Sequence, residues 1–390
     1  VDAAATIVNN VRASFMLSGD VEEALKHITH SLSNASRKLS LVGSTASPVS
    51  HALQSEVLPL VSDPNIIPKN VFDWEFNVLE ITDGMTLCSI IGKFFETLFN
   101  FEEICVDTST LARYIVEVGK NYHDRPFHNL QHSTCVSHFT FKLLTGTDAA
   151  EKLSKYQQFS ILVSAVVHDV DHPGNTNLFE VNSASQLALL YNDSAVLENH
   201  HCSTAFRIMR KPNMQILSNM PKTVATDVRK MIISCVMATD MAVHFELIDE
   251  TKRKALDGGI DFDDPKEQTF LGKILLHAAD LSNPVRPFHM TREWARRISL
   301  EFNDQVHREQ VLGMPVLGFM MTPDEKAFCK NETGFASFVV APMWRAMSML
   351  YPQLNFLVEQ LESNVVVWKE SLEKIQSEEE KTSTFALHTG

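Results

Sequence analysis

The sequence lacks any apolar run of the roughly 18 residues needed to cross a bilayer, and no signal-peptide pattern opens the chain. Both absences predict a protein without direct membrane insertion. The 390 residues suffice for one large domain or two small ones. A hydrophobic content of 44% with 21% charged residues is typical of a soluble globular protein.

Paired cysteines of the CxxC type are also absent, which disfavours a cysteine-based metal site. Most of the six cysteines lie among apolar residues. We therefore interpret them as reduced core residues of a cytoplasmic protein. They are Cys88, Cys105, Cys135, Cys202, Cys235 and Cys329.

The sequence has fewer basic than acidic residues: it contains 34 Lys and Arg and 48 Asp and Glu, and its formal net charge is −14. A surface this acidic argues against nucleic acids and anionic membranes as partners. An anionic substrate would need local positive charge at its site, which a metal ion can supply.

Strand-like alternation is scarce, whereas apolar residues recur at helical spacing along most of the chain. This predicts a compact all-α domain over 71–375. An accessory or linker segment (1–70) would precede it and a frayed tail (376–390) would follow. The stretch 313–323 is apolar but broken by Gly and Pro, which fits either a mobile loop beside a pocket or ordinary surface packing. Predicted helices cover 87–101, 111–122, 132–145, 154–169, 183–191, 195–209, 223–238, 267–280, 291–307, 333–349 and 350–375.

Four ionisable residues, His168, Asp169, Asp171 and His172, follow directly on an apolar helical run, and a Pro-Gly pair then ends the helix. Burying such groups without partners is costly. A bound cation is the most economical reason for them, because imidazole and carboxylate suit Zn²⁺, and carboxylate with water suits Mg²⁺ or Mn²⁺. Asp169 has two oxygens and could bridge two cations, while Asp171 and His172 would orient the ligands. A polar helix cap is the alternative.

Further polar residues in apolar surroundings could complete such a site. His128 and His132 are four residues apart, so on a helix they share a face. Both could bind the metal, or one could donate a proton; a pair of surface histidines is the alternative. Asp280 ends another apolar helix and is a candidate fourth ligand or a capping residue. Glu198 and Thr239 could bond metal-bound water, or each could be a satisfied structural polar group.

Together these residues predict a two-metal hydrolytic site. Two histidines and two aspartates would form an N₂O₂ set, and a second cation would share Asp169. A bridging hydroxide would attack phosphorus while the ions neutralise the developing charge. His128 would protonate the leaving alkoxide.

This series of motifs resembles the catalytic domain of the class I 3′,5′-cyclic nucleotide phosphodiesterases, over roughly residues 70–370. The resemblance implies an all-helical domain of about sixteen helices with a deep two-metal pocket. The matching motifs are HNLQH at 128–132, HDVDHPG at 168–174, YNDSAVLENHH at 191–201, ATDM at 238–241, HAADLSNP at 277–284 and the pair Gly334-Phe335.

The resemblance also implies a role for each matching residue. His128 matches the proton donor, and Asp169 matches the zinc ligand that also reaches a second metal, Mg²⁺ or Mn²⁺. The zinc ligands as a set are His132, His168, Asp169 and Asp280. The positions around metal-bound waters are His172, Glu198 and Thr239. The positions near the base are Asn283, Ile298 and Phe335, the last of which would stack on the purine.

Glu332 departs from the family, which usually has Gln at this position, three residues before the stacking Phe. A carboxylate only accepts hydrogen bonds, so it suits guanine N1–H better than the ring nitrogens of adenine. A protonated Glu332 would imitate Gln. Either Glu332 replaces the Gln functionally, or the base is read elsewhere.

We therefore expect a metal-dependent enzyme that hydrolyses cAMP, with cGMP as a further candidate, to the 5′-monophosphate and so ends cyclic nucleotide signalling. Two alternatives stay open: another HD-type nucleotide phosphohydrolase, or a cyclic-nucleotide-sensing module with a decayed site. A homodimer is compatible with the sequence.

Overall fold

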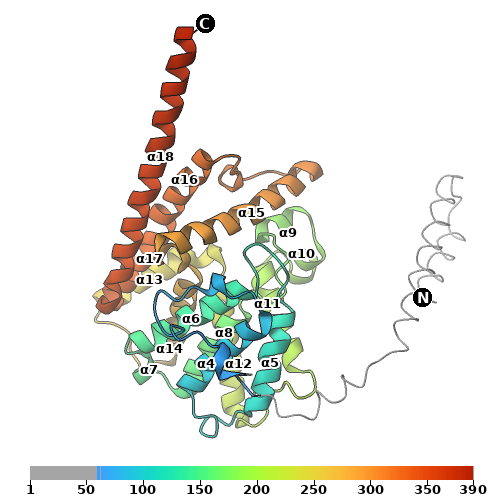
Figure 1. Cartoon of the computed structure of the whole chain (residues 1–390). Helices are drawn as coiled ribbons and strands as arrows, with labels where there is room; N and C mark the ends of the chain where they lie inside the picture. Colours follow the sequence, from blue (N-terminus) through green and yellow to red (C-terminus); the bar gives the residue numbers. More distant parts are fainter. Residues whose placement is uncertain (1–58, 62, 390) are drawn as a thin grey trace, which may run out of the picture. The chain divides into compact units, whose positions relative to one another are not determined.

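The computed structural model describes residues 59–61 and 63–389, and among these it contains helices and no strand, which confirms the predicted all-α fold (Figure 1). Short 3₁₀ segments and one π-helix, η6 (Phe335–Val340), connect or extend the α-helices. The α-helices are α4 (Gly84–Leu98), α5 (Thr108–Lys120), α6 (Leu130–Gly146), α7 (Ala149–Lys152), α8 (Lys155–Val167), α9 (Asn177–Asn182), α10 (Gln186–Tyr191), α11 (Val196–Met209), α12 (Lys222–Met237), α13 (His244–Leu256), α14 (Pro265–Asp280), α15 (Phe288–Leu312), α16 (Glu325–Gly334), α17 (Ala341–Leu350) and α18 (Asn355–Thr389).

Helix α8 lies at the centre of the domain because nearly every residue after its first turn is apolar or small. A reciprocal capping box between Ser154 and Gln157 fixes its start. Phe159 and Val163 belong to the apolar cluster that includes α4 and α5, whereas Ile161 belongs to the cluster that includes α14 and α17. Helix α8 thus packs against α6, α12 and α14. Its C-terminal end lies deep in the core.

Most predicted helices match observed ones to within a few residues, although α18 ends at Thr389 and not at 375. The sequence analysis missed α7, α9, α13 and most of α16. These helices bury little apolar surface: α16 buries only Phe328 and Cys329, and the buried apolar residues of α13 are Leu247 and Ile248. The apolar periodicity on which the prediction depended is correspondingly weak in them.

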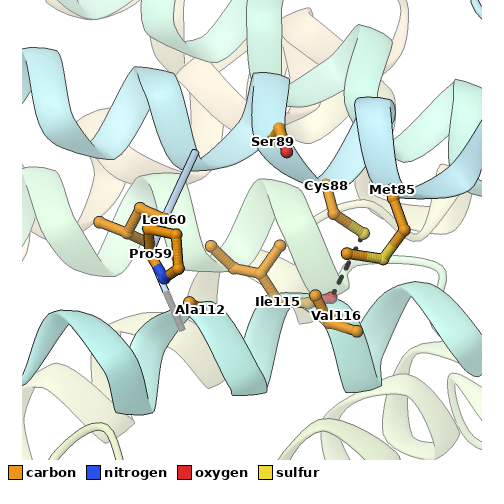
Figure 2. A pocket seen from close by; sticks show the side chains of 8 residues that line it. All are labelled: Pro59, Leu60, Met85, Cys88, Ser89, Ala112, Ile115 and Val116. Carbon is orange, nitrogen blue, oxygen red and sulfur yellow. Dashed lines mark hydrogen bonds between the residues drawn. The ribbon is translucent and has the colours of Figure 1, made fainter. Parts of the chain in front are cut away.

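Residues that precede position 71 also pack on the helical domain. Leu60 belongs to the same buried cluster as α4 and α5, and Figure 2 shows Pro59 and Leu60 beside the residues of these two helices that line a small pocket. Gly92 permits this contact, because a Cβ there would lie 2.3 Å from the Leu60 carbonyl oxygen. The rest of the predicted accessory segment, residues 1–58, falls outside the described residues.

Helix α18 continues to Thr389 and so includes most of the segment 376–390. Its first half packs on the domain through Leu357, Leu361 and Trp368. Within the described chain no single helix has the length and apolarity to cross a membrane. The pair formed by α12 and Met241–Leu256, bent by 80°, is long and apolar enough by composition and length alone.

Replacing Gly92 tests the contact with Leu60. In Gly92→Ala the new methyl group would displace the Leu60 backbone, and we expect the free energy of unfolding to fall by about 1–3 kcal/mol in urea denaturation. Gly318→Ala is the matched control, because no atom lies within 4 Å of a Cβ there. A Gly92→Ala variant as stable as the parent would show that Leu60 does not need this contact.

Candidate metal centre

Four side chains from three helices converge at the centre of the domain. His132 lies in the first turn of α6, which the Asn129 side chain caps by accepting from the His132 amide. His168 and Asp169 follow the last residue of α8, and Asp280 is the last residue of α14. The structure thus brings together all four predicted metal ligands, with one ligand atom of each within 4.8 Å of the others.

The spacing of these atoms fits a single cation. The Nε2 atoms of His132 and His168 are 3.2 Å apart, and each lies 3.0–3.3 Å from Oδ2 of Asp169 and from Oδ1 of Asp280. Ligand atoms about 2.0–2.1 Å from a zinc ion lie about 3.0 Å apart in octahedral geometry and about 3.4 Å apart in tetrahedral geometry. The observed separations fall between these limits.

The tautomer of His168 also suits a ligand. Its Nδ1 donates to the carbonyl of Ala165 at 2.9 Å, so in the neutral ring Nε2 carries the lone pair and faces the other ligand atoms. The Nδ1 of His132, by contrast, is buried without a partner among the described residues.

Although burial lowers the pKa of His168, Asp169 and Asp280 raise it well above its usual range. The carboxylates therefore stabilise positive charge at this point.

Asp169 presents its second oxygen to a further group of buried side chains. Oδ1 of Asp169 lies 3.7 Å from Nε2 of His201, and His172 completes a second cluster that could hold a cation. His201 Nδ1 donates to the Val170 carbonyl at 2.8 Å, which leaves its Nε2 directed at the carboxylate. The two oxygens of Asp169 thus serve two different clusters, as a bridging ligand would.

His128 forms a close ion pair with Glu301 of α15. Its Nδ1 donates to Glu301 Oε1, while the amides of Phe127 and His128 donate to Oε2 at 3.0 and 3.2 Å. Burial lowers the pKa of His128, but Glu301 outweighs it and raises this pKa to about 9. Burial would raise the pKa of Glu301, but His128 lowers it to about 2. His128 is therefore an imidazolium at neutral pH.

His172 lies between two other imidazole rings. It stacks on His128 with ring centres 3.9 Å apart and on His201 at 5.5 Å. Its Nδ1 accepts from the Gly174 amide at 3.0 Å. Burial, followed by the charge of His128, holds the pKa of His172 well below its usual range. A neutral ring with an N–H at Nε2 results, which suits a group that orients water.

The remaining predicted orienting residues have protein partners. Glu198 accepts from Asn177 Nδ2 with both oxygens, and burial raises its pKa to about 7. The Thr239 hydroxyl donates to the Val236 carbonyl at the end of α12. Asp171 bonds His123 and His200 and none of the four candidate ligands, so its part in orienting them is at most indirect.

The residues predicted near the base lie in the 3₁₀ segment Asn283–Val285, on α15, on α16 and in η6. Asn283 is buried and accepts from Cys135 Sγ, and Ile298 is half-buried on α15. Phe335, 36% exposed, is the first residue of the π-helix η6. Glu332 is half-buried, its side chain has no hydrogen bond or ion pair with any described residue, and burial raises its pKa to about 7. In the 313–323 stretch, Phe319 is 60% exposed and contacts Phe302 edge-on.

Sequence reasoning missed Glu301, the partner of His128. The signal was present on α15, where Glu301, Gln305 and Glu309 recur every four residues on a buried face. Gln305 donates to Glu309 and to Thr176, so this polar stripe also holds the loop after the HDVDHPG motif. Three buried polar residues in one helical row indicate a function other than core packing.

Comparisons with known proteins identify a family to which this chain is similar. A family model described as 3′5′-cyclic nucleotide phosphodiesterase matches residues 127–361. The chain is 31% identical over 310 residues to human high affinity cGMP-specific 3′,5′-cyclic phosphodiesterase 9A, covering 80% of this chain and 50% of that protein. It is 32% identical over 298 residues to mouse 3′,5′-cyclic-AMP phosphodiesterase 4C, covering 74% and 43%. It therefore spans about half the length of these relatives.

A solved structure is also similar. The phosphodiesterase domain of the RhoPDE fusion protein from the choanoflagellate Salpingoeca rosetta superimposes with a TM-score of 0.77 at 35% identity. The match covers 79% of this chain and 98% of that one.

Neutralising Glu301 should release the proton on His128. In the Glu301→Gln variant, freed of metal with a chelator, we expect the pKa of His128 to fall by about 1–3 pH units from the value near 9. Burial disfavours the charged imidazolium, and this variant lacks the carboxylate that offsets the effect of burial. NMR titration of the imidazole nitrogens measures this directly. Glu293→Gln, which removes a carboxylate paired with Arg296 and Arg297 on the same helix, is the control. An unchanged His128 pKa in Glu301→Gln would contradict the assignment.

Proposed function

Because the chain belongs to the 3′,5′-cyclic nucleotide phosphodiesterase family, we propose that it hydrolyses 3′,5′-cyclic nucleotides to nucleoside 5′-monophosphates and so ends cyclic nucleotide signalling. The observation that carries the proposal is the convergence of His132, His168, Asp169 and Asp280 beside the charged pair of His128 and Glu301. This combination supports both a place for cations and a proton donor next to it. A module that only sensed the nucleotide would require neither.

The donor sets support zinc at the first cluster and Mg²⁺ or Mn²⁺ at the second. Two imidazoles and two carboxylates are a usual ligand set for Zn²⁺. The second cluster shares only one carboxylate oxygen, that of Asp169, with neutral His172 and His201 beside it, which leaves room for the waters that Mg²⁺ retains. Bound there, the cations would supply Lewis acidity and lower the pKa of water.

The protein's own groups would manage the proton and the leaving oxygen. Water adds to phosphorus and the P–O3′ bond breaks, so O3′ must gain a proton as it leaves. Glu301 holds Nδ1 of His128, so Nε2–H is the atom free to donate, and the raised pKa of His128 keeps it charged until then. Glu301 itself acts through His128 and is a positioning residue.

The first test is hydrolysis of cAMP and cGMP side by side with Mg²⁺, before and after chelation. We expect turnover of at least one nucleotide, its loss on chelation and its recovery when Zn²⁺ and Mg²⁺ are returned. A folded, metal-loaded protein that hydrolyses neither would favour the sensing module. Turnover of nucleotide mono- or triphosphates in place of cyclic nucleotides would favour another HD-type phosphohydrolase.

Glu332 is proposed to read the base beside Phe335. Near its pKa of about 7 the side chain changes from a carboxylic acid to a carboxylate. The acid has one donor and one acceptor, which can serve adenine or guanine, whereas the carboxylate only accepts. An ionised Glu332 and adenine N1 are both hydrogen-bond acceptors and would repel each other. The carboxylate could still accept a hydrogen bond from guanine N1–H. This supports a preference that varies with pH, in place of a fixed choice of cAMP or cGMP.

The ratio of kcat/KM for cAMP to that for cGMP should therefore fall as pH rises. We expect a roughly tenfold decrease between about pH 6 and about pH 8, since ionised Glu332 cannot donate to adenine. Glu332→Gln keeps a donor throughout, so its ratio should stay constant. If neither its ratio nor its rate constants differ from those of the parent protein, the base is read elsewhere.

A further inference from the structure

A buried asparagine of the C-terminal helix faces the segment that follows Asp280. Asn364 lies on α18 and is 1% exposed, and its Oδ1 accepts from Gln360 Nε2 at 2.9 Å. Its Nδ2 is directed at η4 (Asn283–Val285), the short 3₁₀ segment that begins with Asn283, and at the residue after it. An amide is costly to bury unless its hydrogen bonds are satisfied, so its partners there are specific ones.

Thr291 of α15 meets Asn364 at this segment. Nδ2 of Asn364 lies 2.9 Å from the carbonyl oxygen of Pro284, 2.7 Å from that of Arg286 and 3.2 Å from Thr291 Oγ1. The Thr291 hydroxyl is buried and lies 2.9 Å from the carbonyl oxygens of both Asn283 and Arg286. Two helices that are distant in sequence thus direct their donors at one turn of the backbone.

The donors match the acceptors in number. Asn364 supplies two N–H groups and Thr291 one O–H, and three carbonyl groups of one turn receive them. A proton can be shared by two acceptors in a three-centre bond, so the hydroxyl can serve both of its carbonyls. If the hydroxyl favours the Arg286 carbonyl, the Asn283 carbonyl keeps the Arg286 amide as a donor at 3.4 Å. Each of the three carbonyls therefore has a donor in either arrangement.

We propose that Thr291 and Asn364 are positioning residues, which hold η4 so that the side-chain amide of Asn283 meets the base of the nucleotide. Oδ1 of Asn283 accepts from Cys135 Sγ, whereas its Nδ2 has no hydrogen bond with any described residue and is available to a ligand. The backbone turn that carries this amide is fixed by the bonds to Thr291 and Asn364. This role rests on the proposed function, because it requires a nucleotide in the site.

Two changes at position 291 separate the hydroxyl from the size of the side chain. Thr291→Val keeps the volume and removes the O–H, whereas Thr291→Ser keeps the O–H. We expect Thr291→Val to raise KM for the preferred cyclic nucleotide about fivefold with kcat within about twofold, because the metal ligands and His128 are unchanged. Thr291→Ser should stay within about twofold of the parent KM. Thr251→Val is the matched control, since this hydroxyl is also buried but donates within α13, to the Leu247 carbonyl.

Binding of a nucleoside 5′-monophosphate and of ribose 5-phosphate distinguishes a base contact from a general disturbance of the site. Both molecules carry the same phosphate, but only the first has a base. Calorimetric titration of the metal-loaded Thr291→Val variant should show about fivefold weaker binding of the nucleotide and unchanged binding of ribose 5-phosphate. Asn364→Leu removes two N–H groups from the same turn and should show a larger selective loss. Equal loss for both ligands in Thr291→Val, its KM unchanged, or the same rise in KM in Thr251→Val would overturn the proposal.

Hydrogen exchange gives a readout that needs no catalysis. The backbone amides of Val285 and Arg286 should exchange faster in Thr291→Val than in Thr291→Ser or Thr251→Val. Equal exchange in the three variants would show that the hydroxyl does not hold η4 and would also overturn the proposal. A parent protein that hydrolyses neither cAMP nor cGMP would instead refute the proposed function, and the exchange comparison would still test the hold on η4.

Discussion

The requirement that buried ionisable groups be paired governs the centre of this domain. Helices α8 and α14 both run through the core and end in side chains that cannot remain unpaired there. The two helix ends meet each other and the first turn of α6, so that two imidazoles and two carboxylates satisfy one another within 3.3 Å. The apolar helices thus place the polar site, and the site in turn fixes where these helices can end.

The parts of the fold that follow from this requirement could be read from the sequence. An apolar run that stops at His168 and Asp169, and a second one that stops at Asp280, are local signals, and the helices that carry them were predicted closely. The structure brings these residues together with His132, as the sequence analysis expected. Local patterns suffice here because each polar group is adjacent in sequence to the apolar helix that buries it.

The parts that depend on pairing between distant residues could not be read in this way. Glu301 is 173 residues from His128, and nothing in the local sequence of α15 indicates that these two residues pair. His244 begins a helix with little buried apolar surface, so both the helix and the contact of His244 Nε2 with the Val339 carbonyl were missed. The burial of Leu60 likewise depends on its close approach to Gly92, a residue distant in the sequence. Such contacts form only in the tertiary structure, and the spacing of apolar residues along the sequence gives little indication of them.

The stacked rings of His128 and His172 show how one fold gives two identical side chains different charge states. With ring centres 3.9 Å apart, both rings would be costly to protonate together. Of the two rings, Glu301 pairs only with that of His128, so the positive charge lies on His128, and this charge adds to burial in keeping His172 neutral. Two titratable groups whose pKa values are pushed apart can serve as a proton donor and a neutral, water-orienting group. The division of labour between these histidines is therefore set by the position of a single carboxylate on α15, the residue that the motifs themselves do not contain.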